Sequence, residues 1–128
     1  MNPYHRAFVD VLHTLDNAAR MAGRPDVPRL IAVSKTRTAG EVATLAELGQ
    51  KAFGENYVQE AAGKIAALAG RGLEWHLVGH LQSNKAREAA RDFDWVQSVD
   101  RPGLASALAR HRPDGLPPLN VLLQVNID

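Results

Sequence analysis

The sequence predicts an α/β protein built on a parallel β-sheet of five strands. Short apolar stretches alternate with amphipathic ones along the chain. The predicted strands recur about every twenty residues, which is the spacing of βα units. Polar residues follow directly after each predicted strand, at the edge where parallel sheets bind ligands. The chain has 128 residues, enough for one domain with a hydrophobic core.

The elements follow from hydrophobic periodicity and from the residues that interrupt it. Strands are predicted for short apolar runs between turn signals, at residues 30–33, 51–54, 73–78, 95–99 and 119–127. Helices are predicted where apolar residues recur at helical spacing, at residues 5–22, from Thr38 to Gly49, at residues 57–69, at residues 84–91 and after Asp100.

Three helix starts carry capping signals. Thr38 and Glu41 have the spacing of a capping box, in which each side chain binds the other residue's backbone N–H. Asp100 is a predicted cap for the last helix, because Pro102 then falls in its first turn. Ser83 is a candidate cap for the helix at residues 84–91.

Two architectures fit this order of elements. Five parallel strands match an open flavodoxin-like sheet, and they also match the first part of a (β/α)8 barrel of about 250 residues. Length favours the open sheet. The final stretch Asn126-Ile-Asp128 favours the barrel, because it lies at the carboxyl end of a strand with no helix to cover it.

Composition excludes several classes of protein. The net charge of +1 gives no basic surface for general nucleic-acid binding. The absence of cysteine excludes disulfides, thiolate zinc sites and a cysteine nucleophile. The N-terminus has no signal-peptide pattern, and no apolar run is long enough to span a bilayer. We therefore expect a cytoplasmic protein that binds neither nucleic acid nor membranes.

Lys35 is the first candidate for chemistry, because it directly follows the predicted strand LIAV at residues 30–33. A lysine at a strand end commonly snorkels into solvent. Alternatively, partial burial lowers the pKa of a lysine towards the neutral amine that Schiff-base chemistry needs. The residues alone leave both readings open.

Further polar candidates follow the second and third strands. His76 shares a strand face with Glu74, and it is either a hydrogen-bonded core histidine or a donor to a ligand. Asn56 and Asn84 are either turn formers or ligand contacts. The helix start at Ser83 could also attract an anion.

Other catalytic motifs are absent from the sequence. It contains no G-x-S-x-G elbow, no P-loop and no G-x-G-x-x-G turn. His76 and His80 are four residues apart, but they flank a strand end rather than lie on a helix, so we expect no metal site.

Five motifs occur in one order and spacing that point to a known family. They are AVSKT at residues 32–36, FGENYVQE at 53–60, WHLVGHLQSNK at 75–85, SVD at 98–100 and LLQVNID at 122–128. Together they resemble the pyridoxal-5′-phosphate homeostasis protein family, also described as the YggS or proline-synthetase-co-transcribed family. That family looks like the barrel domain of alanine racemase without its second domain.

The resemblance implies that residues 1–128 are the N-terminal part of a single (β/α)8-type barrel domain that binds pyridoxal 5′-phosphate (PLP). By motif position, Lys35 would carry PLP as a Schiff base. The other implied cofactor contacts are Asn56, His76, Gly79, Gln82, Ser83 and Asn84. Family members are thought to bind, buffer or deliver the cofactor inside the cell, and they are not credited with a turnover reaction.

The chain departs from the family pattern because it stops at about half length. Later strands of the family supply the phosphate cradle and the group that faces the pyridine nitrogen. We therefore expect weak retention of PLP, and self-association of a half-barrel whose strand edges are unpaired. The full-length form is expected to be a monomer.

Three alternative functions compete with the carrier hypothesis. A racemase-like enzyme needs acid and base groups on both sides of the substrate's α-carbon, and the sequence offers no candidate for the second group. A receiver-type regulatory module needs acidic residues after the first strand, where Lys35 lies instead. An inactive truncated product is the third alternative.

Overall fold

The computed structural model describes residues 3–127, which form a helix followed by alternating strands and helices. The strands are β1 (Ala32–Val33), β2 (Ala52–Glu55), β3 (Glu74–Leu77), β4 (Trp95–Val99) and β5 (Asn120–Leu123). The helices are α1 (Pro3–Met21), α2 (Ala39–Glu47), α3 (Val58–Ala67), α4 (Ala86–Asp92) and α5 (Pro102–His111), with a 3₁₀ turn η1 (Ser83–Lys85) before α4.

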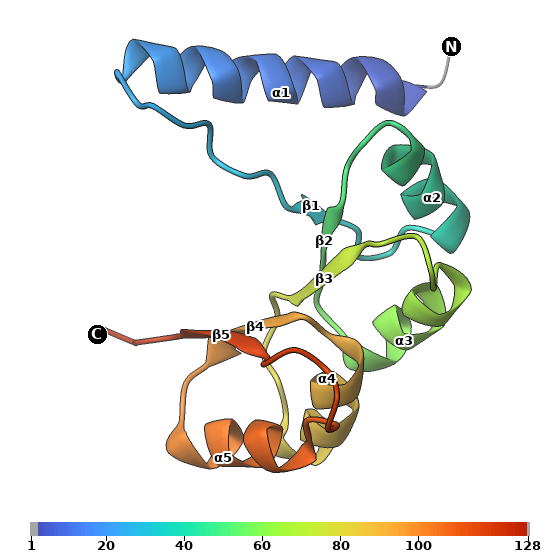
Figure 1. The fold of residues 1–128 in the computed structure, drawn as a ribbon, viewed down its shortest axis with the longest axis vertical. Helices are drawn as coiled ribbons and strands as arrows, with labels where there is room; N and C mark the ends of the chain where they lie inside the picture. Colours follow the sequence, from blue (N-terminus) through green and yellow to red (C-terminus); the bar gives the residue numbers. More distant parts are fainter. Residues whose placement is uncertain (1–2, 128) are drawn as a thin grey trace.

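The five strands form one parallel sheet in the order β1-β2-β3-β4-β5 (Figure 1). A flavodoxin-like sheet would have the order 2-1-3-4-5, so the open-sheet alternative is wrong. Consecutive parallel neighbours are the arrangement of a (β/α)8 barrel, in which each strand pairs with the next. The predicted fold class is therefore confirmed, with five strands of the barrel type present.

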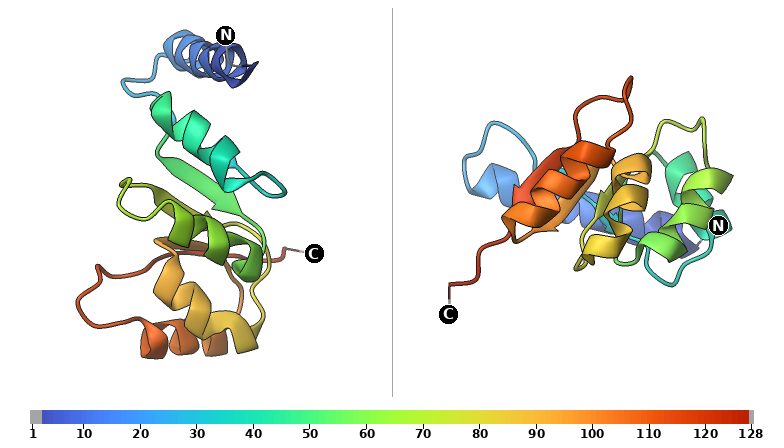
Figure 2. Two further views of the ribbon diagram at one scale, coloured as in Figure 1. Left: turned by 90° about the vertical axis from the view of Figure 1, so that its right-hand side faces the viewer. Right: turned by 90° about the horizontal axis from the view of Figure 1, so that it is seen from below.

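Helices α2 to α5 cover one face of the sheet and leave the opposite face without helices (Figures 1 and 2). The core lies between the sheet and these helices. Phe53 and Trp75 come from neighbouring strands, with ring centroids 5.7 Å apart, and they are buried together with Leu77 and Val96. Burial of these large apolar side chains is the main source of stability for the layer.

The face without helices is more open. A Cβ atom added at Gly54 would lie 3.3 Å from Ile31, 3.4 Å from Val78 and 3.5 Å from Val33. These side chains therefore converge over a position that has none. Val33 nevertheless keeps 56% of its surface exposed.

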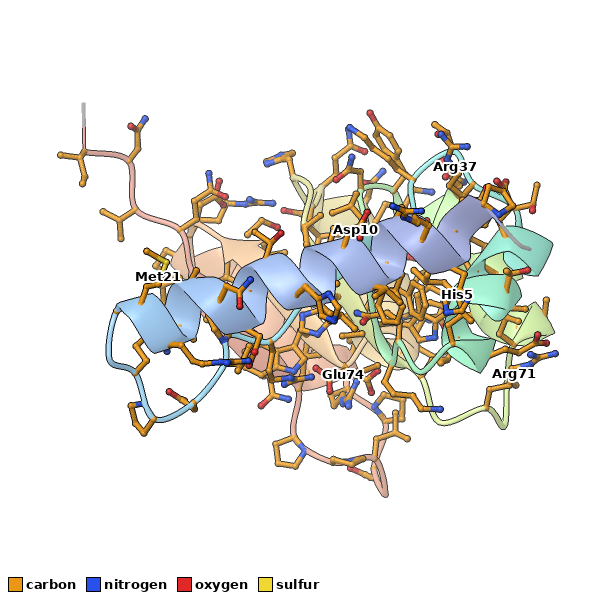
Figure 3. The ribbon with its side chains drawn as sticks, turned by 90° about the horizontal axis from the view of Figure 1, so that it is seen from above. His5, Asp10, Met21, Arg37, Arg71 and Glu74 are labelled. Atoms are coloured by element: carbon orange, nitrogen blue, oxygen red, sulfur yellow. The ribbon has the colours of Figure 1, made fainter. Side chains whose placement is uncertain are left out.

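Helix α1 packs beside the β1 edge of the sheet, next to α2 (Figure 3). Its apolar side includes the buried Phe8 and Ala19, whereas Met21 at its C-terminal end is exposed. Of the helices within residues 3–127, none combines the length and the hydropathy needed to cross a bilayer.

Both edge strands are shorter than predicted. At β1, the Gln50 side-chain amide donates to the Leu30 carbonyl over 2.7 Å, so a side chain takes the place of a strand neighbour there. At β5, pairing stops soon after Leu123, because the neighbouring strand β4 ends at Val99. Residues 119–127 are thus a strand only in their middle.

The predicted caps have different outcomes. The capping box is confirmed, since Glu41 N–H donates to Thr38 Oγ1 over 3.1 Å and Thr38 N–H donates to Glu41 Oε1 over 3.0 Å. The cap predicted at Asp100 is wrong, because α5 begins one residue later and Asp100 instead accepts a bond from Arg101. The cap predicted at Ser83 is also wrong, because η1 has no side-chain cap.

Candidate functional site

Lys35 lies in a tight turn directly after β1. Arg37 N–H donates to the Ser34 carbonyl over 3.1 Å, which places Lys35 and Thr36 in the middle of the turn. Thr36 has a φ of +64°, a conformation that β-branched residues rarely adopt. The Lys35 side chain is exposed, so the described residues do not bury it partially, as one of the two interpretations of the sequence required.

A pocket of about 380 Å³ opens beyond the carboxyl ends of β2 and β3. Asn56, Gly79 and Gln82 line it, together with His80 and Lys85. Within residues 3–127 the side chains of Asn56 and Gln82 have no hydrogen-bond partner, so their amide groups remain free to bind a ligand.

Gly79 brings the two loops at this pocket into close contact. A Cβ atom at this position would lie only 2.6 Å from the Asn56 carbonyl oxygen and 3.0 Å from the Asn56 Cα. The Gly79 carbonyl also accepts a hydrogen bond of 2.6 Å from the buried Ser98 hydroxyl on β4. The ends of β2, β3 and β4 are therefore tied together at the ligand edge of the sheet.

His76 is buried, and both of its ring nitrogens are hydrogen-bonded. The Gln97 amide nitrogen donates to His76 Nδ1 over 3.0 Å, which leaves the Nε2–H to donate to Glu74 over 2.7 Å. The ring also stacks on Trp95 with centroids 5.5 Å apart. This geometry matches the core-histidine reading, in which the ring supports the sheet rather than offering a free donor.

Glu74 links His76 to the segment before β1. Arg29 donates to the Glu74 carboxylate over 3.0 Å, and Glu74 is labelled in Figure 3. Partial burial alone would raise the pKa of Glu74, but the hydrogen bonds from His76 and Arg29 outweigh it and hold the pKa below its usual range. Glu74 is therefore a stable anion partner for the His76 ring.

Ser83 and Asn84 lie in η1, next to the pocket but outside its lining. Both are exposed. The Ser83 hydroxyl accepts a bond of 3.0 Å from the Arg101 guanidinium, which also donates to the Leu81 carbonyl over 2.9 Å. The structure thus brings Asn56, Gly79 and Gln82 into one pocket, and it leaves Lys35, His76, Ser83 and Asn84 outside that lining.

A buried polar cluster on the helix-covered side of the sheet was not predicted from the sequence. Ser34 and Glu55 are both buried there. There they meet Lys64 of α3, which is only 6% exposed. Two signals could have revealed this cluster: a carboxylate in a strand with apolar neighbours, and the four-residue spacing of Glu60 and Lys64.

Ser34, Glu55, Glu60 and Lys64 form what we call the Lys64 cluster. Lys64 Nζ lies 3.0 Å from Glu55 Oε2, 3.1 Å from Glu60 Oε1 and 2.7 Å from the Ser34 carbonyl oxygen. The Ser34 hydroxyl also donates to Glu55. The Thr36 N–H and then the Lys64 ammonium, both donating to the Glu60 carboxylate, hold the pKa of Glu60 below its usual range.

Comparison with known proteins assigns this chain to a family. The model of the alanine racemase N-terminal domain matches residues 9–128. The chain belongs to that family.

Relatives and solved structures agree with this assignment. The chain is 54% identical over 111 residues to the pyridoxal phosphate homeostasis protein of Pseudomonas aeruginosa, covering 86% of this chain and 48% of the relative. It is 47% identical over 131 residues to the protein of that name from Escherichia coli, covering 99% and 56%. PipY of Synechococcus elongatus, solved with PLP bound, matches with a TM-score of 0.63 and 44% identity over 76% of this chain and 47% of PipY.

These matches confirm the resemblance predicted from the five sequence motifs. The chain spans about half the length of the curated relatives it matches, at 48% and 56% of the two proteins above.

Proposed function

We propose that this chain is the N-terminal part of a PLP-binding barrel domain and that it serves intracellular PLP homeostasis by carrying PLP as a Schiff base on Lys35. The proposal has three supports: the family membership, the relatives named for PLP homeostasis and the PLP-bound structure of PipY. The observation that carries it is the position of Lys35, an exposed amine at the carboxyl end of β1.

The residues present fit one part of the cofactor well. PLP supplies an aldehyde, with which a neutral lysine amine condenses with loss of water. Lys35 offers an accessible amine, and Asn56 and Gln82 offer unused amide groups on the same edge of the sheet. Gly79 holds the loop that carries Gln82 against Asn56, which keeps these polar groups at fixed positions.

The residues present provide fewer partners for the phosphate group of PLP. The cation that lines the pocket is Lys85, and the Arg101 guanidinium is already bonded to Leu81, Ser83 and Asp100. We therefore expect this chain to take up PLP and to release it on dialysis, because a covalent amine alone gives a reversible attachment.

Titration with PLP tests the proposal. The wild-type chain should develop the absorbance band of a PLP-lysine Schiff base, and the Lys35→Ala chain should not, whereas Lys51→Ala should behave like wild type. Lys51 is a suitable control because it is exposed at the opposite end of β2. Equal bands in all three proteins would reject a specific role for Lys35.

The absence of turnover is a separate part of the proposal. Racemisation needs an acid and a base on opposite sides of the substrate α-carbon. Incubation of the PLP-loaded chain with amino acids in deuterated water should give no exchange of the α-proton. Exchange that is lost in Lys35→Ala would favour the racemase-like alternative instead.

A further inference from the structure

A fully paired ion cluster lies directly beneath the turn that carries Lys35. Glu55 has no exposed surface and Lys64 is 6% exposed, and they form a salt bridge of 3.0 Å between β2 and α3. Burying two charges is costly, and an apolar pair of similar size commonly stabilises a core as well or better. The pair therefore calls for an explanation other than packing.

All three N–H donors of the Lys64 ammonium have hydrogen-bond acceptors. Its three acceptors are the Glu55 carboxylate, the Glu60 carboxylate at 3.1 Å and the Ser34 carbonyl at 2.7 Å. An ammonium has three N–H donors, so Lys64 is satisfied by these groups. Because all three donors of this buried amine are engaged, Lys64 is a structural partner of this turn.

Two bonds of the cluster end on the backbone at either side of Lys35. Lys64 holds the Ser34 carbonyl, and Glu60 accepts a hydrogen bond of 2.6 Å from the Thr36 N–H. The Ser34 N–H donates in turn to the Gly54 carbonyl over 2.8 Å, which extends the pairing of β1 with β2. The residue between these anchored groups is the exposed Lys35.

The conformation of Thr36 shows that the turn is held against its own preference. A positive φ at a β-branched residue persists only where the surrounding contacts impose it. The Glu60 carboxylate supplies such a contact at the Thr36 N–H. Because the backbone is fixed, the amine of Lys35 samples a smaller region of space than a lysine on a free loop.

We infer that Glu60 and Lys64 are positioning residues, which fix the Ser34–Thr36 turn so that the Lys35 amine meets an incoming aldehyde. This inference rests on the proposed role of Lys35 as the PLP-binding amine. In this inference, the buried salt bridge from Glu55 holds the Lys64 side chain in position. Placement of reacting groups in this way accelerates a condensation without any direct contact to the ligand.

Glu60→Ala tests the inference without leaving the buried pair incomplete. The Glu60 side chain is 33% exposed, so its truncation keeps the Glu55–Lys64 bridge and removes the acceptor for the Thr36 N–H. Glu60→Gln is the matched control, because its amide oxygen still accepts that bond. Circular dichroism and thermal unfolding establish that both variants are folded.

The readout is covalent labelling rather than activity. Each chain is incubated with PLP, borohydride reduces the condensation product to a secondary amine, and peptide mapping gives the labelling rates of Lys35 and Lys51. In wild type, Lys35 should label faster than Lys51. Glu60→Ala should lower the Lys35 rate by about tenfold and leave the Lys51 rate unchanged, and Glu60→Gln should restore it.

A second variant examines the other anchor. The double variant Glu55→Leu/Lys64→Met replaces the ion pair with apolar side chains of similar size and removes the donor to the Ser34 carbonyl. It should show the same selective loss at Lys35 and retain its fold.

The outcomes separate this inference from the proposed function. Equal labelling of Lys35 and Lys51 in wild type would reject the PLP-binding role of Lys35 itself. Selective labelling in wild type that persists in folded Glu60→Ala and in the double variant would overturn the positioning role alone. An equal loss in Glu60→Ala and Glu60→Gln would also overturn it, because the Thr36 bond would then not be the cause.

Discussion

At the scale of single residues, Lys35 combines an exposed side chain with an anchored backbone. Exposure makes the amine accessible to a cofactor, and the bonds at Ser34 and Thr36 limit where it can be. From the sequence, a solvated strand end and partial burial were both open for Lys35. The side chain is solvated, so its proposed reactivity rests on the placement of the amine rather than on a low-dielectric environment.

Gly79 is the second residue whose role is decided by its immediate surroundings, because they leave no room for a side chain. We predict that Gly79→Ala destabilises the chain by about 1–3 kcal/mol, because the new Cβ would lie 2.6 Å from the Asn56 carbonyl oxygen and backbone must move. Urea unfolding measures the change in free energy. The same shift should weaken PLP uptake, since it separates Asn56 from the loop that carries Gln82.

Gly63→Ala is the control for this prediction. Gly63 lies within α3, and an added Cβ would have no atom within 4 Å. Because alanine favours helix more than glycine does, the variant should be more stable by roughly 0.5–1 kcal/mol. A Gly79→Ala chain as stable as wild type would show that the close contact between the two loops is relaxed in solution.

At the scale of elements, the start of α2 joins three parts of the chain. Glu41 completes the capping box with Thr38, accepts a bond from the Tyr4 hydroxyl of α1 and pairs with Arg37 over 3.5 Å. The Thr38 N–H and then the Tyr4 hydroxyl lower the pKa of Glu41 from 4.5 to about 2. Folding therefore favours the ionised form of this carboxyl.

This lowered pKa predicts how stability depends on pH. The stabilisation by ionised Glu41 is fully present above about pH 4.5 and is lost as the pH falls towards about 2. Glu41→Gln should be less stable than wild type at pH 6, and the difference should shrink on acidification. Urea unfolding at a series of pH values measures both curves.

Glu47→Gln serves as the control on the same helix, since its carboxylate is 73% exposed and pairs only weakly with Arg71 at 4.0 Å. It should run parallel to wild type across the series. If the gap between Glu41→Gln and wild type stayed constant from pH 6 to pH 2, the links from Tyr4 and Thr38 to Glu41 would not operate in solution.

Elements of this chain were largely predictable, whereas their contacts were not. The five helices and five strands follow from periodicity, and the capping box of α2 follows from Thr38 and Glu41. The cap at Asp100 failed because capping depends on where the helix begins, and Arg101 draws that carboxylate into a salt bridge. The local sequence does not determine which hydrogen-bond or ionic partner such a side chain takes.

The candidate site shows the same division. The family resemblance implied Asn56, Gly79 and Gln82 as cofactor contacts, and they meet in one pocket because they follow neighbouring strands. The Lys64 cluster was missed because its members come from the turn after β1, from β2 and from α3, and only tertiary packing brings them together. Alternation of side chains along a strand does not say which face the helices cover, so the burial of Glu55 could not be predicted.

At the scale of the whole molecule, the sheet has a bare face and an exposed edge. Strand β5 is exposed throughout, and Leu123 and Val125 keep 74% and 75% of their surface accessible. Unpaired edges with apolar side chains promote pairing between chains. We therefore predict that the chain self-associates through β5 as its concentration rises.

Leu123→Lys tests this prediction, because a charge on an edge strand opposes pairing. Light scattering after gel filtration should show a lower mean mass than wild type at equal concentration. Met21→Lys is the matched control, since Met21 is 89% exposed at the far end of α1 (Figure 3). A wild-type chain that is monomeric at all concentrations, or an equal effect of both variants, would contradict an interface at β5.

The central claim, that Lys35 is the PLP-binding amine, is tested most directly by mass-spectrometric mapping. The wild-type chain is incubated with PLP, reduced with borohydride and digested. We predict that the cofactor mass lies on the peptide containing Lys35 and disappears in Lys35→Ala without moving to another lysine. A label spread evenly over the lysines, or unchanged in Lys35→Ala, would contradict the account.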